Sequence, residues 1–212
     1  MSDTQKPTEA TSTPHYTRSG DDGTTTLGEA GAVDKGDVRL EAYADCGEAN
    51  AGIGIALAMS PLPVHVVTAL SSIQHDLFDL VTGLTHPSSR QEPAAQATSS
   101  HITQEHIDRL ERLCDHYGAD LPPVDGYVLP GGTVTASLLF QAWSVTLRAE
   151  RSTWAAVHAY PDTVDPLAPR YLNRLASLLY VLARAANAEH GDTMWYPMAS
   201  VTTPVEATPT ND

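Results

Sequence analysis

Apolar residues recur at steps of three and four along several segments of the chain, which is the spacing of one face of an α-helix. Residues 61–84 show this most clearly, through Val66, Leu70, Ile73, Leu77, Leu80 and Leu84. Related patterns predict four more helices, over residues 38–59, 103–119, 133–160 and 169–188. No segment shows the sustained alternation of a strand. Five helices with short connections predict an all-α, up-and-down, antiparallel bundle.

The bundle is predicted to occupy residues 15–197, between two disordered tails. Residues 1–14 and 198–212 are rich in Ser, Thr, Pro and charge, and such segments bury too little apolar surface to fold. Residues 85–101 form a polar loop inside the domain. Asp37 stands just before the first helix, where its side chain would act as the N-cap.

The charge of the chain limits what it can bind. The formal net charge is −14, and the two lysines are Lys6 and Lys35. Binding to nucleic acid needs clustered Lys and Arg, so no nucleic-acid partner is expected. An anionic small molecule would require the few cations to gather locally.

The sequence also favours a cytoplasmic protein without a membrane segment. It contains no run of 18 apolar residues, and its N-terminus lacks the pattern of a signal peptide. Cys46 and Cys114 form no CxxC pair and are expected to be buried thiols. His65 and His75 are ten residues apart, which is not ligand spacing, and no metal site is predicted.

Three stretches do not fit a purely structural role. "YTRSGDDGTT", residues 16–25, offers glycines, hydroxyls and backbone amides that can hold phosphate oxygens, or is a flexible lead-in. "RAER", residues 148–151, places two arginines on neighbouring turns, either as a charged surface or as part of a site. "YLNRL", residues 171–175, interrupts an apolar helix with Asn173 and Arg174.

Together with "VRLEAYADCGEAN" and "YVLPGG", these stretches resemble, in the same order, the PduO-type ATP:cob(I)alamin adenosyltransferases. The resemblance extends from Tyr16 to about Pro197. It implies a five-helix bundle that assembles as a homotrimer with active sites between adjacent subunits. The implied reaction transfers the 5′-deoxyadenosyl group of ATP, bound with Mg²⁺, to the cobalt of cob(I)alamin, and releases triphosphate. ATP and cobalamin would thus be substrates and Mg²⁺ the cofactor.

The resemblance also implies roles for particular residues. Matched to ATP are Thr17, Arg18, Ser19, Gly20, Thr25, Thr26, Lys35, Arg148, Glu150, Arg151 and Asn173. Of these, Arg148 would act in catalysis, stabilising the charge of triphosphate. Tyr127 is the second residue expected to act in catalysis. It stands where the family has a Phe against the lower face of the corrin, and it keeps an aromatic ring there.

Several positions depart from the family pattern. Gly47 replaces an aspartate, whereas the histidine and two arginines of the long helix are replaced by Phe140, Trp143 and Leu147. In the last helix, Ala176 and Ser177 replace a Ser-Asp pair. In the family, the aspartate at the position of Gly47 and the arginine at the position of Trp143 pair across the subunit boundary. Gly47 and Trp143 therefore predict that this contact between subunits has become apolar.

These departures leave three hypotheses open. The first is an active, divergent adenosyltransferase. The second is a homologue that binds ATP or corrinoid without efficient catalysis, as a sensor, a carrier or a trimer partner. The third is a purely structural trimer. A cobalamin reductase or an adenosylcobalamin-dependent enzyme is a candidate partner of the first.

Overall fold

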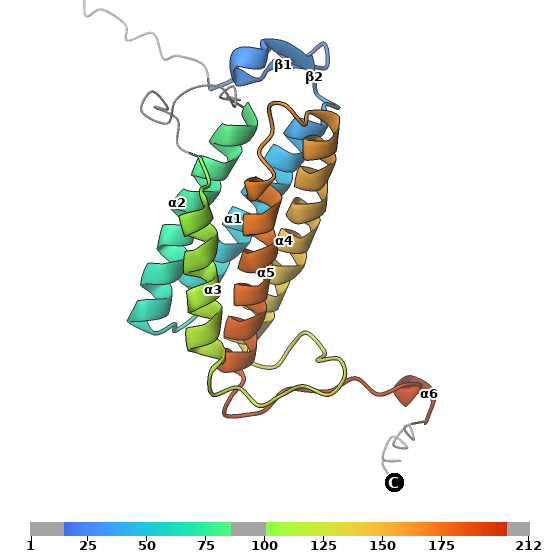
Figure 1. Ribbon diagram of the computed structural model, residues 1–212. Helices are drawn as coiled ribbons and strands as arrows, with labels where there is room; N and C mark the ends of the chain where they lie inside the picture. Colours follow the sequence, from blue (N-terminus) through green and yellow to red (C-terminus); the bar gives the residue numbers. More distant parts are fainter. Residues whose placement is uncertain (1–14, 86–100, 203–212) are drawn as a thin grey trace, which may run out of the picture.

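The computed structural model describes residues 15–85 and 101–202 (Figure 1). Residues 1–14 and 203–212, which belong to the predicted tails, lie outside the described residues, as do residues 86–100 of the predicted loop. Among the described helices, none is both long and apolar enough to cross a membrane.

Five long helices form the molecule, as the periodicity predicted. They are α1 (Val38–Met59), α2 (Val64–Thr85), α3 (Gln104–Gly118), α4 (Val134–Ala159) and α5 (Leu167–Ala186). Each runs antiparallel to the one before it, which gives the up-and-down bundle (Figure 1). The start of α2 differs from the expectation: it begins at Val64, after Pro63, because the ring of Pro63 disfavours the α conformation in the preceding residue, Leu62.

The two helices that pack together most closely, α1 and α4, each begin at a residue whose side chain acts as the N-cap. Asp37 Oδ1 accepts a hydrogen bond from the Arg39 backbone N–H at 2.9 Å, which confirms it as the N-cap of α1. Thr133 Oγ1 accepts one from the Ala136 N–H at 3.1 Å at the start of α4. Each cap satisfies a backbone donor that the first turn leaves unpaired.

The packing of α1 against α4 depends on small side chains. The buried residues of α1 include Ala42, Cys46, Ala49, Gly52 and Ala56, and those of α4 include Ala142, Thr146, Ala149, Thr153 and Ala156. A Cβ added to Gly52 would lie 3.5 Å from the Cα of Ala142, so the two backbones approach closely. This seam of small residues fixes how near the two helices can come.

Of the two cysteines expected to be buried, Cys46 is completely buried in this seam, whereas Cys114 on α3 is only half-buried. Burial raises the pKa of the Cys46 thiol to about 12 and that of Cys114 to about 11. Both thiols are therefore protonated at neutral pH and poorly suited to nucleophilic chemistry.

A buried polar cluster joins three other helices. Asp76 of α2 accepts hydrogen bonds through Oδ2 from Tyr171 Oη of α5, at 2.9 Å, and from Arg109 Nη1 of α3, at 3.1 Å. Burial, reinforced by the Asp76 carboxylate, raises the pKa of Tyr171. The cluster satisfies groups that would otherwise be unpaired inside the bundle.

The spacing of apolar residues in the sequence did not predict the short elements outside the five helices. An antiparallel hairpin of β1 (Thr24–Thr26) and β2 (Ala32–Asp34), joined by the 3₁₀ turn η1 (Gly28–Ala30), pairs Thr25 with Val33. Strands of three residues are too short to show alternation. A one-turn helix, α6 (Ala199–Thr202), lies where the C-terminal tail was predicted to have begun, and its four residues are not buried.

The tight turn before α4 requires glycine. Gly132 has φ of +97°, and a Cβ placed on it would lie 2.7 Å from the Asn187 side-chain Cγ. That Asn187 carboxamide accepts a hydrogen bond from the Thr133 N–H at 3.0 Å and donates one to the Gly131 carbonyl at 2.9 Å. The turn thus connects the start of α4 to the end of α5.

Gly132→Ala should lower the free energy of unfolding by about 1–3 kcal/mol, because the new methyl group adds backbone strain and displaces Asn187. Gly83→Ala is the control: in α2 an added Cβ meets nothing within 4 Å, and alanine should stabilise the helix by up to about 1 kcal/mol. Chemical denaturation of both variants tests this. Equal stabilities would show that Gly132 is not required.

Candidate functional site

The N-terminal loop and hairpin cover one end of the bundle, over the start of α1 and the end of α2 (Figure 1). Within the loop, the hydroxyls of Thr17 and Ser19 are 2.9 Å apart and share a hydrogen bond. Lys35, directly after β2, donates from Nζ to the carbonyl of Gly20 at 2.6 Å. A Cβ on Gly20 would lie 2.8 Å from that Nζ, so a side chain there would displace the lysine. The structure therefore brings Thr17, Ser19, Gly20 and Lys35 together, as residues of one small loop.

Arg18 has an uncommon backbone conformation in this loop, with φ of +62°. Its guanidinium lies 5.3 Å from the centre of the Tyr16 ring, and the arginine is exposed. Strained residues in the left-handed region occur often at ligand sites. Thr25 and Thr26 follow in β1, where Thr25 is half-buried and Thr26 is exposed.

A buried ion pair anchors the base of the hairpin to the bundle. Arg39 donates from Nε and Nη2 to the two carboxylate oxygens of Asp37 at 3.0 and 2.7 Å, and both side chains are 9% exposed. Tyr160, at the end of α4, donates from its hydroxyl to Asp37 at 3.0 Å, and its ring lies 4.0 Å from the Arg39 guanidinium. These contacts hold the start of α1, and so the end of β2, against the end of α4.

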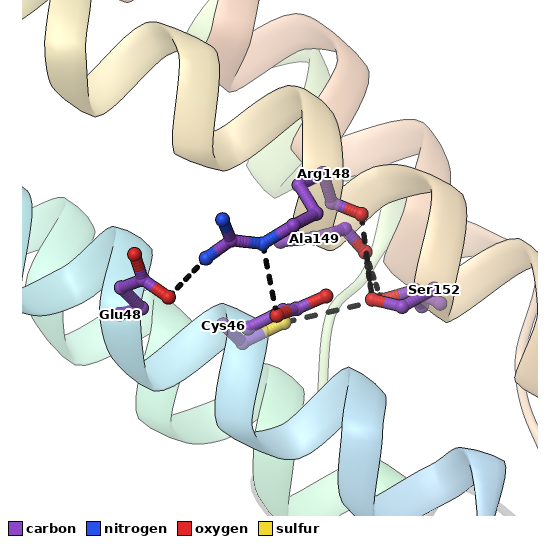
Figure 2. Close-up of polar contacts among 7 residues, drawn as sticks. Cys46, Glu48, Arg148, Ala149 and Ser152 are labelled. Carbon is purple, nitrogen blue, oxygen red and sulfur yellow. Dashed lines mark hydrogen bonds and ion pairs between the residues drawn. The ribbon is translucent and has the colours of Figure 1, made fainter.

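The predicted site residues of α4 point in different directions. Arg148 points toward α1, where Nε donates to Asp45 Oδ1 at 3.1 Å and Nη2 pairs with Glu48 (Figure 2). Glu150 instead accepts a hydrogen bond from Asn173 Nδ2 of α5 at 3.2 Å. Residues two apart on a helix differ by about 200° in direction, which places these two side chains on nearly opposite sides of α4.

Arg151 lies between these two directions and is exposed. Within the described ranges, its side chain makes no hydrogen bond or ion pair, and the same ranges give no ion pair to Arg18 or Lys35. Both ends of the Asn173 carboxamide are hydrogen-bonded, because Nδ2 donates to Glu150 and Oδ1 accepts from Arg174. Arg174 also donates from Nε to Glu111 at 2.7 Å. Three of the predicted cations, Arg18, Lys35 and Arg151, therefore make no ion pair within the part of the chain that the structure describes.

Tyr127 lies far from all these groups in a single chain. It belongs to the loop between α3 and α4, at the end of the bundle opposite the hairpin (Figure 1). Its side chain is 74% exposed and meets Trp195 edge to face, with ring centres 5.8 Å apart. Arg148 comes fourteen residues after Val134 in α4, which alone corresponds to about 21 Å along the helix axis.

The replaced positions of α4 form an aromatic cluster. Phe140, Trp143 and Tyr180 of α5 have ring centres between 5.6 and 6.2 Å apart. Gly47 instead lines a cavity of about 340 Å³ between α1 and α2, and a Cβ on it would meet nothing within 4 Å. Trp143 does not fill the space at Gly47 within one chain, so the predicted apolar seam between them requires two chains.

The described ranges contain no group of three or more His, Cys, Asp or Glu side chains arranged to hold a metal ion. A Mg²⁺ ion at this site would rely on ligands from its nucleotide, since Mg²⁺ commonly keeps several waters and binds substrate phosphates with few protein ligands.

Comparison with known proteins agrees with the order of the motifs. The family model for cobalamin adenosyltransferases matches residues 15–186. The chain belongs to the cobalamin adenosyltransferase family. It is 47% identical, over 86% of its own length and 95% of the other, to a corrinoid adenosyltransferase of Mycobacterium leprae. It is 36% identical to one of Bacillus subtilis, over 83% of this chain and 88% of that one.

A solved structure shares the fold of this family member. It is a variant of the PduO-type ATP:corrinoid adenosyltransferase from Lactobacillus reuteri, complexed with cobalamin and ATP. The TM-score is 0.74 at 28% sequence identity, over 87% of this chain and 97% of the other. The similarity thus covers most of both chains.

Two groups near the site were missed by sequence reasoning. One is the Asp37–Arg39–Tyr160 cluster, and the other is Asp45 with its bond to Arg148. The signal for the second was present, because Asp45 and Glu48 are three residues apart and so lie on one face of α1. Only the packing of α1 against α4 shows that this face meets Arg148.

The Asp37–Arg39 pair predicts a pH dependence of stability. Hydrogen bonds from Arg39 hold the pKa of Asp37 well below its usual range. An unfolded aspartate has a pKa of about 3.9, so the stability that the pair contributes is present above about pH 4 and is lost as the pH falls below that value.

Asp37→Asn keeps an N-cap but loses the charge, and should reduce the free energy of unfolding by about 1–3 kcal/mol at neutral pH. The difference from wild type should shrink as the pH is lowered from about 5 to about 2. Urea denaturation across that range measures it, with the exposed Asp162→Asn as control. A constant difference at every pH would contradict the role given to the Asp37 charge.

Proposed function

We propose that this protein transfers the 5′-deoxyadenosyl group of MgATP to the cobalt of a reduced corrinoid and releases triphosphate. The observation that carries the proposal is the exposure of Arg18, Lys35 and Arg151 without ion-pair partners among the described residues, in a chain of net charge −14. Such unpaired cations suit a polyanionic ligand. The named activity of the relatives and the ATP and cobalamin bound by the Lactobacillus reuteri protein support the same reaction.

In this reaction the cobalt is the nucleophile. Its electron pair forms the bond to the C5′ carbon of ATP, the bond between C5′ and its oxygen breaks, and triphosphate leaves with that electron pair. The protein supplies no nucleophile of its own. Its contribution is to orient the two substrates and to stabilise the charge that develops on the leaving triphosphate.

The N-terminal loop would bind the phosphates. Lys35 and Arg18 supply charge, and hydroxyls are supplied by Thr17, Ser19, Thr25 and Thr26. Gly20 keeps the loop backbone close to Lys35. Mg²⁺ would reach the site on the phosphates of ATP, bound by phosphate oxygens and water.

The α4 and α5 helices would supply the other half of the nucleotide site. Arg151 offers the unpaired charge, and Glu150 and Asn173, which are bonded to each other, offer polar contacts. Arg148, assigned to ATP by the resemblance, has its guanidinium bonded to Asp45 and Glu48 in this structure. Arg151 is therefore the stronger candidate for charge stabilisation.

Tyr127 would lie against the corrin, as an aromatic ring on the side of the cobalt that faces away from ATP. Because Tyr127 and the hairpin occupy opposite ends of one bundle, a corrinoid beside Tyr127 cannot reach a nucleotide under the hairpin of the same chain. We propose that two adjacent chains of a homotrimer complete each site, and that the N-terminal loop and hairpin of one chain and α4 of its neighbour enclose the nucleotide. In that assembly, Gly47 and Trp143 of different chains would form the apolar seam.

A second candidate function is ligand binding without efficient transfer. The observation that favours it is the Phe140–Trp143–Tyr180 cluster, which places apolar rings where the resemblance implies histidine and arginine. Such a protein would bind ATP and form no adenosylcobalamin.

The chemistry also implies partners and a compartment. The reaction consumes cob(I)alamin, so a cobalamin reductase must supply it, and an adenosylcobalamin-dependent enzyme would use the product. Because cob(I)alamin persists only under reducing conditions, we place the reaction in the cytoplasm.

Arg151→Ala should lower kcat/KM for ATP by about 10²–10³-fold, the usual effect of removing one preorganised charge donor. Arg170→Ala, which removes another exposed arginine, should leave kcat/KM unchanged. Loss of the cob(I)alamin spectrum in the presence of MgATP measures the rate.

Two outcomes of that assay, combined with a measurement of ATP binding, contradict the proposed function or the role of Arg151. If wild type binds ATP but forms no adenosylcobalamin, the second candidate function holds. If wild type is active and Arg151→Ala is equally active, Arg151 does not contact triphosphate.

A further inference from the structure

Asp45 makes a directional contact between the two most closely packed helices. Its Oδ1 accepts a hydrogen bond from Arg148 Nε at 3.1 Å, while Glu48, one turn further along α1, pairs with Nη2 of the same guanidinium (Figure 2). The Asp45 side chain is 15% exposed, compared with 53% for Glu48 and 44% for Arg148. Asp45 is thus the more buried of the two carboxylate partners of the arginine.

Near Arg148, the buried residues that α1 and α4 contribute are mostly small, among them Cys46 and Ala49 of α1 and Ala149 and Ser152 of α4. The contacts of Tyr160 with Asp37 and Arg39 lie further along, at the hairpin end of the two helices. Small side chains allow close approach but resist rotation or sliding weakly, so a polar contact in this part of the seam adds to the register that Tyr160 sets at the hairpin end. Two carboxylates that hold one planar guanidinium provide such a contact.

The rotation of α4 decides where Arg151 lies. Arg151 is three residues beyond Arg148, so their directions differ by about 60°, and Glu150 lies about 160° from Arg148. A turn of α4 about its axis would move Arg151 and Glu150 together, and would separate Glu150 from Asn173 on α5. Holding Arg148 against α1 therefore sets the position of the groups proposed to contact the nucleotide.

We infer that Asp45 is a positioning residue for ATP, which acts through Arg148 to orient α4. Arg148 itself is then a positioning residue rather than a ligand of triphosphate. This inference rests on the proposed function, because it concerns the affinity and turnover of ATP at that site.

Asp45→Asn should lower kcat/KM for ATP by about 10–100-fold, the scale of a small misplacement of binding groups, mainly through a higher KM. Its melting temperature should change little, because a partly exposed ion pair contributes little to stability. Asp76→Asn is the matched control. It also removes an aspartate that accepts a hydrogen bond from an arginine on another helix, and should lower the melting temperature without changing KM.

The charge swap Asp45→Arg with Arg148→Asp separates positioning from contact. If the pair only orients α4, the swapped protein should recover KM relative to Asp45→Arg and Arg148→Asp alone. If the swapped protein does not fold, the cycle of Asp45→Asn, Arg148→Gln and both together gives the same answer: positioning predicts that the double change raises KM no more than either single change.

The outcomes are distinct. Wild type without adenosylcobalamin formation would overturn the proposed function itself. Active wild type with an unaffected Asp45→Asn would overturn only the inference. An Arg148→Gln protein that is far less active than Asp45→Asn would also overturn it, since Arg148 would then contact the nucleotide directly.

Discussion

The close packing of α1 against α4 is the constraint on which the rest of the structure depends. Small residues such as Gly52 and Ala142 let the backbones approach closely, and the N-caps at Asp37 and Thr133 define where each helix begins. In this packing Arg148 faces α1, Glu150 faces α5, and Arg151 is exposed between them. Because side chains on a helix are 100° apart, these directions cannot be adjusted independently.

This geometry explains how an acidic chain can serve a polyanionic substrate. Among the described residues, five arginines have ion partners, such as Arg39 with Asp37 and Arg109 with Asp76. The cations without such partners among the described residues include Arg18, Lys35 and Arg151, at the hairpin end and on the outer face of α4. Tyr127 is held at the other end by the pairing of Val128 with Met194. In the proposed account, assembly of several chains is therefore a requirement of the chemistry.

The sequence predicted the five helices because their apolar stripes are long, as from Val66 to Leu84, and it predicted Asp37 as a cap because capping is local. It did not predict the β1–β2 hairpin, because three residues per strand carry no periodic signal. The ATP-loop residues came from the resemblance, and the structure places Lys35 against Gly20 as one loop. The partner of Arg148 could not be predicted, because it depends on which faces of two distant helices meet. The half-burial of Cys114 has the same cause, since α3 lies at the edge of the bundle.

The central claim is that the hairpin of one chain and α4 of its neighbour form one nucleotide site. Subunit complementation tests it most directly, using Lys35→Ala and Arg151→Ala proteins that are each nearly inactive. If the site is shared, random mixed trimers restore an intact pair of residues at about a quarter of the interfaces, and the mixture recovers a corresponding fraction of wild-type adenosylcobalamin formation. Mass spectrometry confirms that mixed trimers have formed. If they form and the mixture is no more active than its two components, both residues act within one chain and the account is wrong.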